Sequence, residues 1–194
     1  MPGTRRQYDI DTLTQVALRV FAERGFDGAS MDDVARAAGI TKAAIYHHVS
    51  SKEALLERGL SRALEALFAL LEEPQARGGA ALERLRFVVR RVAELALAFR
   101  PELTVLVRVR GNSAAERHAI ARRRAFDAAV TAIVVEAQGS GDVDPALDPS
   151  LAVRLIFGTC NSVVEWYRPG GPLAASAVAE SIVRVVFEGI LPRT

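Results

Sequence analysis

The chain has 194 residues, half of them hydrophobic and a quarter charged, with a net charge of +2 and a sequence pI near 9.0. This composition excludes an intrinsically disordered chain, which would be less hydrophobic and more highly charged. The first ten residues lack the apolar core of a signal peptide and no apolar run is long enough to cross a bilayer, so we expect a cytoplasmic protein without a membrane partner.

Apolar residues recur at helical spacing and strand signals are nearly absent, which predicts an all-α protein with about nine helices. The first helix is expected from about Asp11 to Arg24. The second begins at a capping box, in which the side chains of Ser30 and Asp33 each accept a backbone hydrogen bond, and ends at Gly39.

The third helix is predicted to follow Thr41 as its N-cap and to end near His48. A second capping box, Ser50 with Glu53, is predicted to begin the fourth helix, which continues to Pro74. Only residues 39 and 40 separate the second helix from the cap of the third. This is the spacing of a helix-turn-helix, in which the second of the two helices enters a groove of DNA.

The remainder of the chain is more apolar and predicts five further helices, over residues 80–99, 101–109, 113–138, 150–168 and 174–190. Residues 139–150 are expected to be a linker. The segment 150–168 is apolar almost all round, so we expect it to be buried on more than one side. It contains Cys160, the single cysteine, whose apolar surroundings predict a buried and unreactive thiol.

Lys42 and Lys52 are the only lysines among the 25 lysines and arginines of the chain. Both lie at the first positions of predicted helices, where the helix dipole makes a cation unfavourable. A phosphate bound at each helix start would remove this conflict, because helix N-termini bind anions and a lysine adds positive charge to the amide donors. The alternative is that both are solvated surface lysines.

The third helix is predicted to contact DNA through its exposed face, with Ile45 packed inward. Small side chains such as Ala43 allow a close approach to base edges, and Tyr46 offers a hydroxyl to a phosphate. The complete set of predicted DNA-binding residues is Ser30, Thr41, Lys42, Ala43, Tyr46, His47 and Lys52.

The run SMDDVARAAGITKAAIYHHVSSKEALL, with ALRVFAERGFDGAS before it, resembles the DNA-binding domain of the TetR family of bacterial transcriptional repressors over about residues 13–56. Val49 departs from the family, which more often has Phe there. The resemblance implies a helix-turn-helix domain over residues 1–52 and a ligand-binding and dimerisation domain over 53–194. It also implies a homodimer on a palindromic operator, released by a small-molecule effector.

By the same resemblance, the last two helices would form a four-helix bundle with a second subunit. The sequence is compatible, because Val178, Ile182 and Val185 belong to an apolar stripe on the last helix. Packing of this stripe within one chain is the alternative, and the sequence does not separate the two.

The motif NSVVEWYRPGG is similar to the C-terminal domains of TetR-type regulators of fatty-acid, steroid and aromatic-acid catabolism, several of which respond to acyl-CoA thioesters. An acyl-CoA needs cations for its phosphates, which arginines between Arg108 and Arg124, or Arg168, would supply. A solvated arginine-rich helix face is the alternative. The predicted pocket residues, which could also be simple core, are Phe87, Arg91, Phe99, Leu106, Phe126, Val130, Phe157, Asn161, Val164, Glu165 and Trp166.

An enzyme is the weaker hypothesis, because no nucleophile elbow, phosphate loop or dinucleotide fingerprint is present. His47 and His48 are adjacent on a helix and point in different directions, so we expect no metal site there. An enzyme would require paired acid and base groups facing the pocket. A DNA-binding protein without an effector, the third possibility, would have a filled core instead of a pocket.

Overall fold

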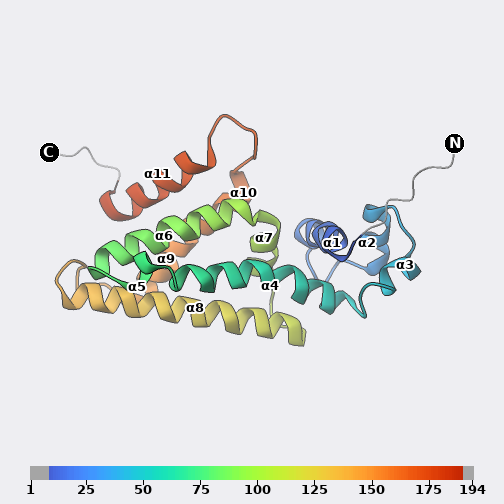
Figure 1. Ribbon diagram of the computed structural model, residues 1–194, viewed down its shortest axis with the longest axis horizontal. Helices are drawn as coiled ribbons and strands as arrows, with labels where there is room; N and C mark the ends of the chain where they lie inside the picture. The colour runs from blue at the N-terminus through green and yellow to red at the C-terminus, as the bar shows by residue number, and fades with distance from the viewer. Residues whose placement is uncertain (1–8, 190–194) are drawn as a thin grey trace.

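Three helices lie together at one end of the molecule in the computed structural model, which describes residues 9–189 (Figure 1): α1 (Ile10–Arg24), α2 (Met31–Ala38) and α3 (Lys42–Tyr46). Their N-caps are Asp9, Ser30 and Thr41, and each of these side chains accepts a hydrogen bond from the backbone. Gly39 ends α2 in the left-handed conformation, with φ of 68°, which allows the sharp turn before Thr41. The predicted helix-turn-helix is confirmed.

Helix α4 (Lys52–Leu71) extends from this end along the body of the molecule. Its N-cap is Ser51, whose hydroxyl accepts a hydrogen bond from the backbone N–H of Ala54 at 3.0 Å. The prediction of Ser50 as the cap, paired with Glu53, is therefore wrong by one residue. The turn after α3, closed by the backbone bond from Val49 to the Ile45 carbonyl, uses one more residue than expected, and Lys52 becomes the first residue of its helix.

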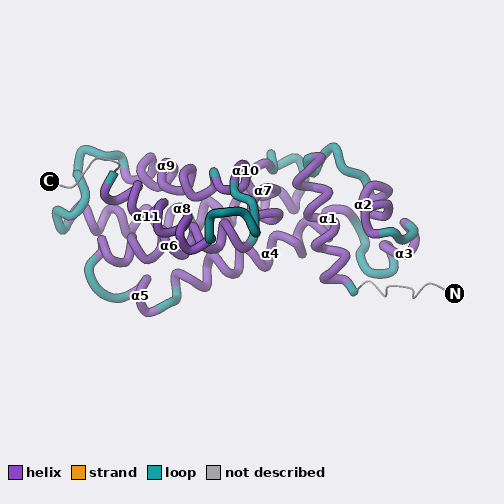
Figure 2. Tube along the Cα trace, turned by 90° about the horizontal axis from the view of Figure 1, so that it is seen from above, coloured by secondary structure: helices purple, strands orange, loops and turns teal. Residues whose placement is uncertain are grey.

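Seven helices complete the described chain: α5 (Pro74–Arg77), α6 (Ala81–Ala98), α7 (Arg100–Arg108), α8 (Ala114–Gly139), α9 (Pro149–Asn161), α10 (Val163–Trp166) and α11 (Ala175–Glu188). Helices α4, α6 and α8 run along the long axis and contact one another, while α9 packs on α6 and α8, and α11 packs on α6 (Figures 1 and 2). Between residues 9 and 189, no strand is present and no helix is long and apolar enough to span a membrane.

The described chain has eleven helices, where about nine were predicted, because α5 and α10 are separate short helices. Pro74 occupies the first turn of α5, a position that proline tolerates well, although it ends the preceding helix. The predicted helix over 150–168 is interrupted at Ser162. The hydroxyl of Ser162 donates to the Thr159 carbonyl at 2.8 Å, a local bond that competes with regular helix.

Two hydrophobic cores meet along α4. The amino-terminal core packs Phe21, Val34 and Ile45 against the first half of α4. The carboxy-terminal core includes the last turn of α4 and the facing sides of α6, α8, α9 and α11. Cys160 is fully buried in it, as predicted, and burial raises the pKa of its thiol to about 12, which keeps the thiol protonated.

Part of the apolar surface of α9 and α11 remains open to solvent. On α9, Val153 and Phe157 are buried, whereas Leu151 and Leu155 are 52% and 64% exposed. The expectation that this segment is buried on more than one side is therefore wrong for the single chain. On α11, the stripe is divided, because Val178 and Ile182 are buried and Val185 is 47% exposed.

Candidate functional site

The end of the molecule formed by α2 and α3 presents small and polar side chains to solvent. Ile45 is fully buried, as predicted, and anchors α3 on the amino-terminal core, so the opposite face of this short helix is exposed. Six of the seven predicted DNA-binding residues are exposed here: Ser30, Thr41, Lys42, Ala43, Tyr46 and His47.

Lys42 is the first residue of α3, and its ammonium donates a hydrogen bond to Asp32 Oδ2 at 2.8 Å. This bond, followed by the negative charge of Asp32, raises the pKa of Lys42. Both side chains are largely exposed, so the pair is held weakly and a phosphate could replace the carboxylate at little cost. The unfavourable cation at the helix start is thus compensated in part by a neighbouring anion.

Lys52 is the seventh predicted residue, and its ammonium already has protein partners. It donates to the backbone carbonyls of Phe26 at 2.8 Å and Ala29 at 3.0 Å, and lies 4.4 Å from the centroid of the Phe26 ring. These contacts hold the loop between α1 and α2 against the start of α4. Two of the three N–H donors of this ammonium are used in this way, so Lys52 positions the loop and keeps one donor for a phosphate.

Asp33 fixes the start of α2 more firmly than the capping box alone. Its Oδ2 accepts hydrogen bonds from the backbone and hydroxyl of Ser30, and its Oδ1 accepts from Arg24 at 2.8 Å and Arg36 at 3.1 Å. The bonds from Ser30 lower the pKa of Asp33, with the two guanidiniums adding to the effect. Through Arg24, the last residue of α1, Asp33 also joins α1 to α2, a link that sequence spacing did not indicate.

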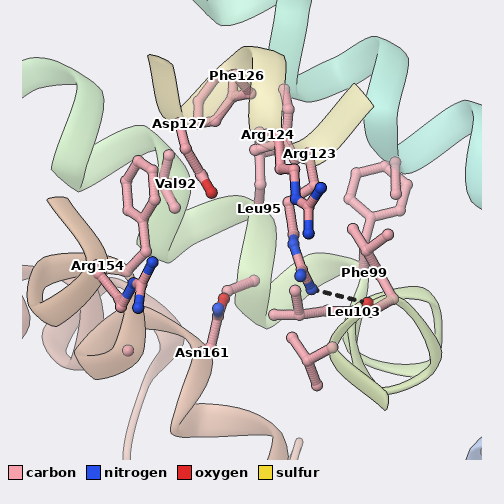
Figure 3. Close-up of a pocket in the computed structure, with 17 residues that line it drawn as sticks. Val92, Leu95, Phe99, Leu103, Arg123, Arg124, Phe126, Asp127, Arg154 and Asn161 are labelled. Atoms are coloured by element: carbon pink, nitrogen blue, oxygen red, sulfur yellow. Dashed lines mark hydrogen bonds between the residues drawn. The ribbon is translucent and has the colours of Figure 1, made fainter. Parts of the chain in front are cut away.

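A cavity of about 450 Å³ lies between α4, α6, α7, α8 and α9 (Figure 3). Its walls are mainly apolar and consist of Ala63, Leu67, Val92, Leu95, Ala96, Phe99, Leu103, Leu106, Val107, Phe126, Phe157 and Gly158. Its polar residues are Arg123, Arg124, Asp127, Arg154 and Asn161. This size and polarity are typical of a site for an organic ligand.

Five of the eleven predicted pocket residues line this cavity, namely Phe99, Leu106, Phe126, Phe157 and Asn161. Phe87 and Arg91 also belong to α6, but the residues of this helix that line the cavity are Val92, Leu95 and Ala96. Phe87 instead lines a groove between α6 and α11, and Arg91 pairs with Glu73 and Glu94.

The other four predicted residues also lie outside the cavity. Val130 is fully buried in the carboxy-terminal core. Val164, Glu165 and Trp166 belong to α10, beyond the interruption at Ser162. Glu165 pairs with Arg108 at 2.9 Å, and Trp166 is 48% exposed.

Two charged cavity residues, Asp127 and Arg154, were not predicted. Arg154 is the only charged residue between Asp148 and Glu165, and a single cation in so apolar a helix was a signal that it faces a polar site. Burial raises the pKa of Asp127, and the positive charges of Arg123 and Arg154 oppose this shift. Asp127 therefore carries a charge that its surroundings stabilise incompletely.

Replacing Asp127 by asparagine should stabilise the protein at about pH 7. A carboxyl whose pKa is raised on folding destabilises the folded state increasingly as the pH rises from the ordinary value, 3.8, to the raised pKa. The advantage of asparagine should therefore shrink as the pH falls through the raised pKa and disappear below 3.8. Thermal unfolding of both proteins across this range measures the difference. A variant that is less stable at neutral pH would show that attraction to Arg123 and Arg154 outweighs burial.

Helix α7 connects the cavity to the amino-terminal helices. Leu103, Leu106 and Val107 line the cavity, while the buried Glu102 accepts a hydrogen bond from Gln15 of α1 at 3.0 Å. Arg108, at the end of α7, donates to the Ala22 carbonyl of α1 at 3.0 Å as well as to Glu165. A change in the cavity wall can therefore reach α1 through one short helix.

Comparison with known proteins gives two family matches. Residues 13–58 match the family described as bacterial regulatory proteins, tetR family, and residues 78–190 match the tetracyclin repressor-like C-terminal domain. The HTH-type transcriptional repressor KstR2 of Mycolicibacterium smegmatis is 30% identical over 198 residues, which cover 97% of this chain and 92% of that protein.

Two solved structures are similar over nearly the whole chain. SCO3833, a member of the TetR transcriptional regulator family from Streptomyces coelicolor, is 48% identical with a TM-score of 0.87, and the match covers 99% of this chain and 97% of that one. The ketosteroid transcriptional regulator KstR2 of Mycobacterium tuberculosis is 27% identical with a TM-score of 0.83, over 97% and 98% of the two chains.

Proposed function

The chain belongs to the TetR family of bacterial transcriptional regulators, and we propose that it is a homodimeric cytoplasmic repressor that binds a palindromic operator and is released by an effector in the cavity. The observation that carries the proposal is the coexistence of an exposed recognition helix at one end of the fold with a largely apolar cavity in its body. Residues 1–52 would bind DNA, and residues 53–194 would bind the effector and the second subunit.

Dimer formation is supported by the open apolar face of α9 and α11. Leu151, Leu155 and Val185 are about half exposed or more, although a single chain gains stability by burying such side chains. A second copy packed on this face would bury them in a four-helix bundle. The two α3 helices would then lie about 34 Å apart, one turn of DNA, and read the two halves of a palindrome.

Effector binding is supported by the composition of the cavity. Aromatic and aliphatic walls would surround an acyl group, and the arginines would meet the phosphates of an acyl-CoA thioester, which is the effector that we propose. Among the described residues that line the cavity, Asp127 is the one carboxylate, and the lining includes no histidine, lysine or cysteine that could act with it in proton transfer. This arrangement favours a binding site over the active site of an enzyme.

Replacing Lys42 by alanine should weaken operator binding and make it less dependent on salt, because one phosphate contact would be lost. The operator can be recovered by selecting random DNA duplexes with the full-length protein, and affinity is then measured at several salt concentrations. We expect the slope of log affinity against log salt to fall by about one unit. Unchanged affinity and slope would contradict a phosphate contact by Lys42.

Three further variants accompany this measurement. Asp32→Asn removes the carboxylate that competes for Lys42, so it should tighten binding to any duplex. Arg58→Ala removes an equally exposed cation from α4, where it pairs with Asp11, and should leave the slope unchanged. Lys52→Ala should lower the melting temperature together with affinity, because Lys52 holds the α1–α2 loop.

A further inference from the structure

The cavity has an apolar bottom and a charged mouth. Leu106, Phe126 and Phe157 are buried and form the bottom, whereas Arg124, Arg154 and Gly158 are exposed and mark the mouth. A Cβ atom at Gly158 would meet no atom within 4 Å, so the space in front of α9 is open at this position. A ligand would therefore enter with its apolar part first.

The cations at the mouth have few protein partners. Arg123 donates a hydrogen bond to the Leu106 carbonyl at 3.1 Å, which fixes its guanidinium to the wall. Among the described residues, Arg124 and Arg154 have no hydrogen-bond acceptor, and no ion pair within 4.0 Å joins either of them to Asp127. Figure 3 shows Arg154 and Asp127 directed into the same space, with the Asn161 amide below them and the arginines of α8 opposite.

The charges of this site favour an anionic ligand. Three arginines and one aspartate leave the lining with a net charge of +2, although the surrounding walls are apolar. Hydrogen bonds between guanidinium groups and anionic oxygens are short and strong, and they are strongest where apolar walls limit access of water. Asp127 opposes an anion, because its negative charge faces the same space.

We infer, on the basis of the proposed function, that the effector is an amphipathic organic anion whose oxygens bind Arg124 and Arg154 while its apolar chain lies against Phe126 and Phe157. The anionic oxygens belong to a carboxylate in a free acid and to the phosphates in a CoA thioester, and both sources share this chemistry. Asp127 sets the affinity by repelling the anion, so its neutralisation strengthens binding.

The test is calorimetric titration of the full-length protein with decanoate, decanoyl-CoA, decanol and CoA. Decanol has the same chain without the charge, and CoA has the phosphates without the chain. We expect at least one of the two amphipathic anions to bind at least ~10-fold more tightly than decanol, with an affinity that falls as salt is added. A preference for decanoate identifies a carboxylate as the group that the arginines bind, and a preference for decanoyl-CoA identifies the phosphates as that group.

Two variants change the charge of the mouth in opposite directions. The double variant Arg124→Ala with Arg154→Ala should weaken binding of the preferred anion by ~10-fold or more and leave the binding of decanol unchanged. Asp127→Asn should tighten binding of the anion by several-fold. Arg110→Ala, an exposed arginine of the same basic segment outside the cavity, is the matched control and should have no effect. A folding defect cannot produce the gain in affinity expected for Asp127→Asn. That variant therefore tests the inference even if the double variant is unstable.

Three outcomes would overturn the inference. Decanol could bind as tightly as both anions, neither anion could bind, or Asp127→Asn could lower the affinity for the anion. Operator binding separates this failure from failure of the proposed function. A protein that selects a palindromic operator but ignores organic anions remains a repressor with a different effector. A protein that binds the anion and selects no DNA sequence retains the anion site and loses the proposed function.

Discussion

Replacing Phe126 by alanine is expected to lower the free energy of unfolding by about 3–5 kcal/mol. Phe126 is 2% exposed, stacks on Phe157 with ring centroids 5.6 Å apart, and meets Phe68 edge to face at 6.0 Å. Its removal would forfeit these contacts and join a new void to the existing cavity, which neighbouring helices cannot close without shifting. Chemical denaturation of the purified protein measures the loss.

Phe99 provides the comparison for this prediction. It also lines the cavity, but it is only partly buried, so Phe99→Ala should cost clearly less than Phe126→Ala. Equal losses for the two variants would contradict the prediction, because neither the deeper burial of Phe126 nor its stacking on Phe157 would then contribute to stability.

Replacing Gly59 by alanine should destabilise the amino-terminal core by about 1–3 kcal/mol, although alanine is the better helix former by about 1 kcal/mol. A Cβ atom at this position in α4 would lie only 2.7–2.9 Å from three side-chain carbons of Leu18 in α1. Leu18 is fully buried, so a shift of its side chain would have to displace other atoms of the close-packed core. The added methyl group would therefore force α1 and α4 apart.

Gly158→Ala is the matched control, because Gly158 also lies inside a helix but has open space where the methyl group would go. This variant should gain about 0.5–1 kcal/mol from helix propensity alone. A gain of similar size in Gly59→Ala would disprove close packing between α1 and α4. Thermal melts of the two variants beside the unmodified protein distinguish the outcomes.

Local sequence signals predicted the first helices well because their ends are defined by capping side chains and a glycine. Ser30 with Asp33, Thr41 and Gly39 determine where α2 and α3 begin and end through bonds within a few residues. The same local signals were ambiguous where two candidates were adjacent, as with Ser50 and Ser51 at the start of α4. Short helices such as α5 and α10 depend on packing more than on propensity, so periodicity did not reveal them.

The exposed face of α3 was predictable because a buried residue at one helix position determines which positions face solvent, and Ile45 is such a residue. The partners of the two lysines could not be predicted, because the fold alone brings Asp32 close to Lys42 and brings Phe26 and Ala29 close to Lys52. The cavity posed a harder problem. Apolar periodicity identifies a buried face but does not reveal whether neighbouring side chains fill the space in front of it, which is why Phe99 and Phe87 could not be distinguished.

Helix α4 begins six residues after the end of α3 and extends to the cavity, where Ala63 and Leu67 form part of the wall. Its 20 residues make a rod about 30 Å long. A tilt of about 5° around its cavity end would carry its other end, together with α3, through about 2.5 Å. That displacement is close to the length of a hydrogen bond, so a movement too small to disturb the packing around Leu67 would be amplified into the loss of contacts to base edges.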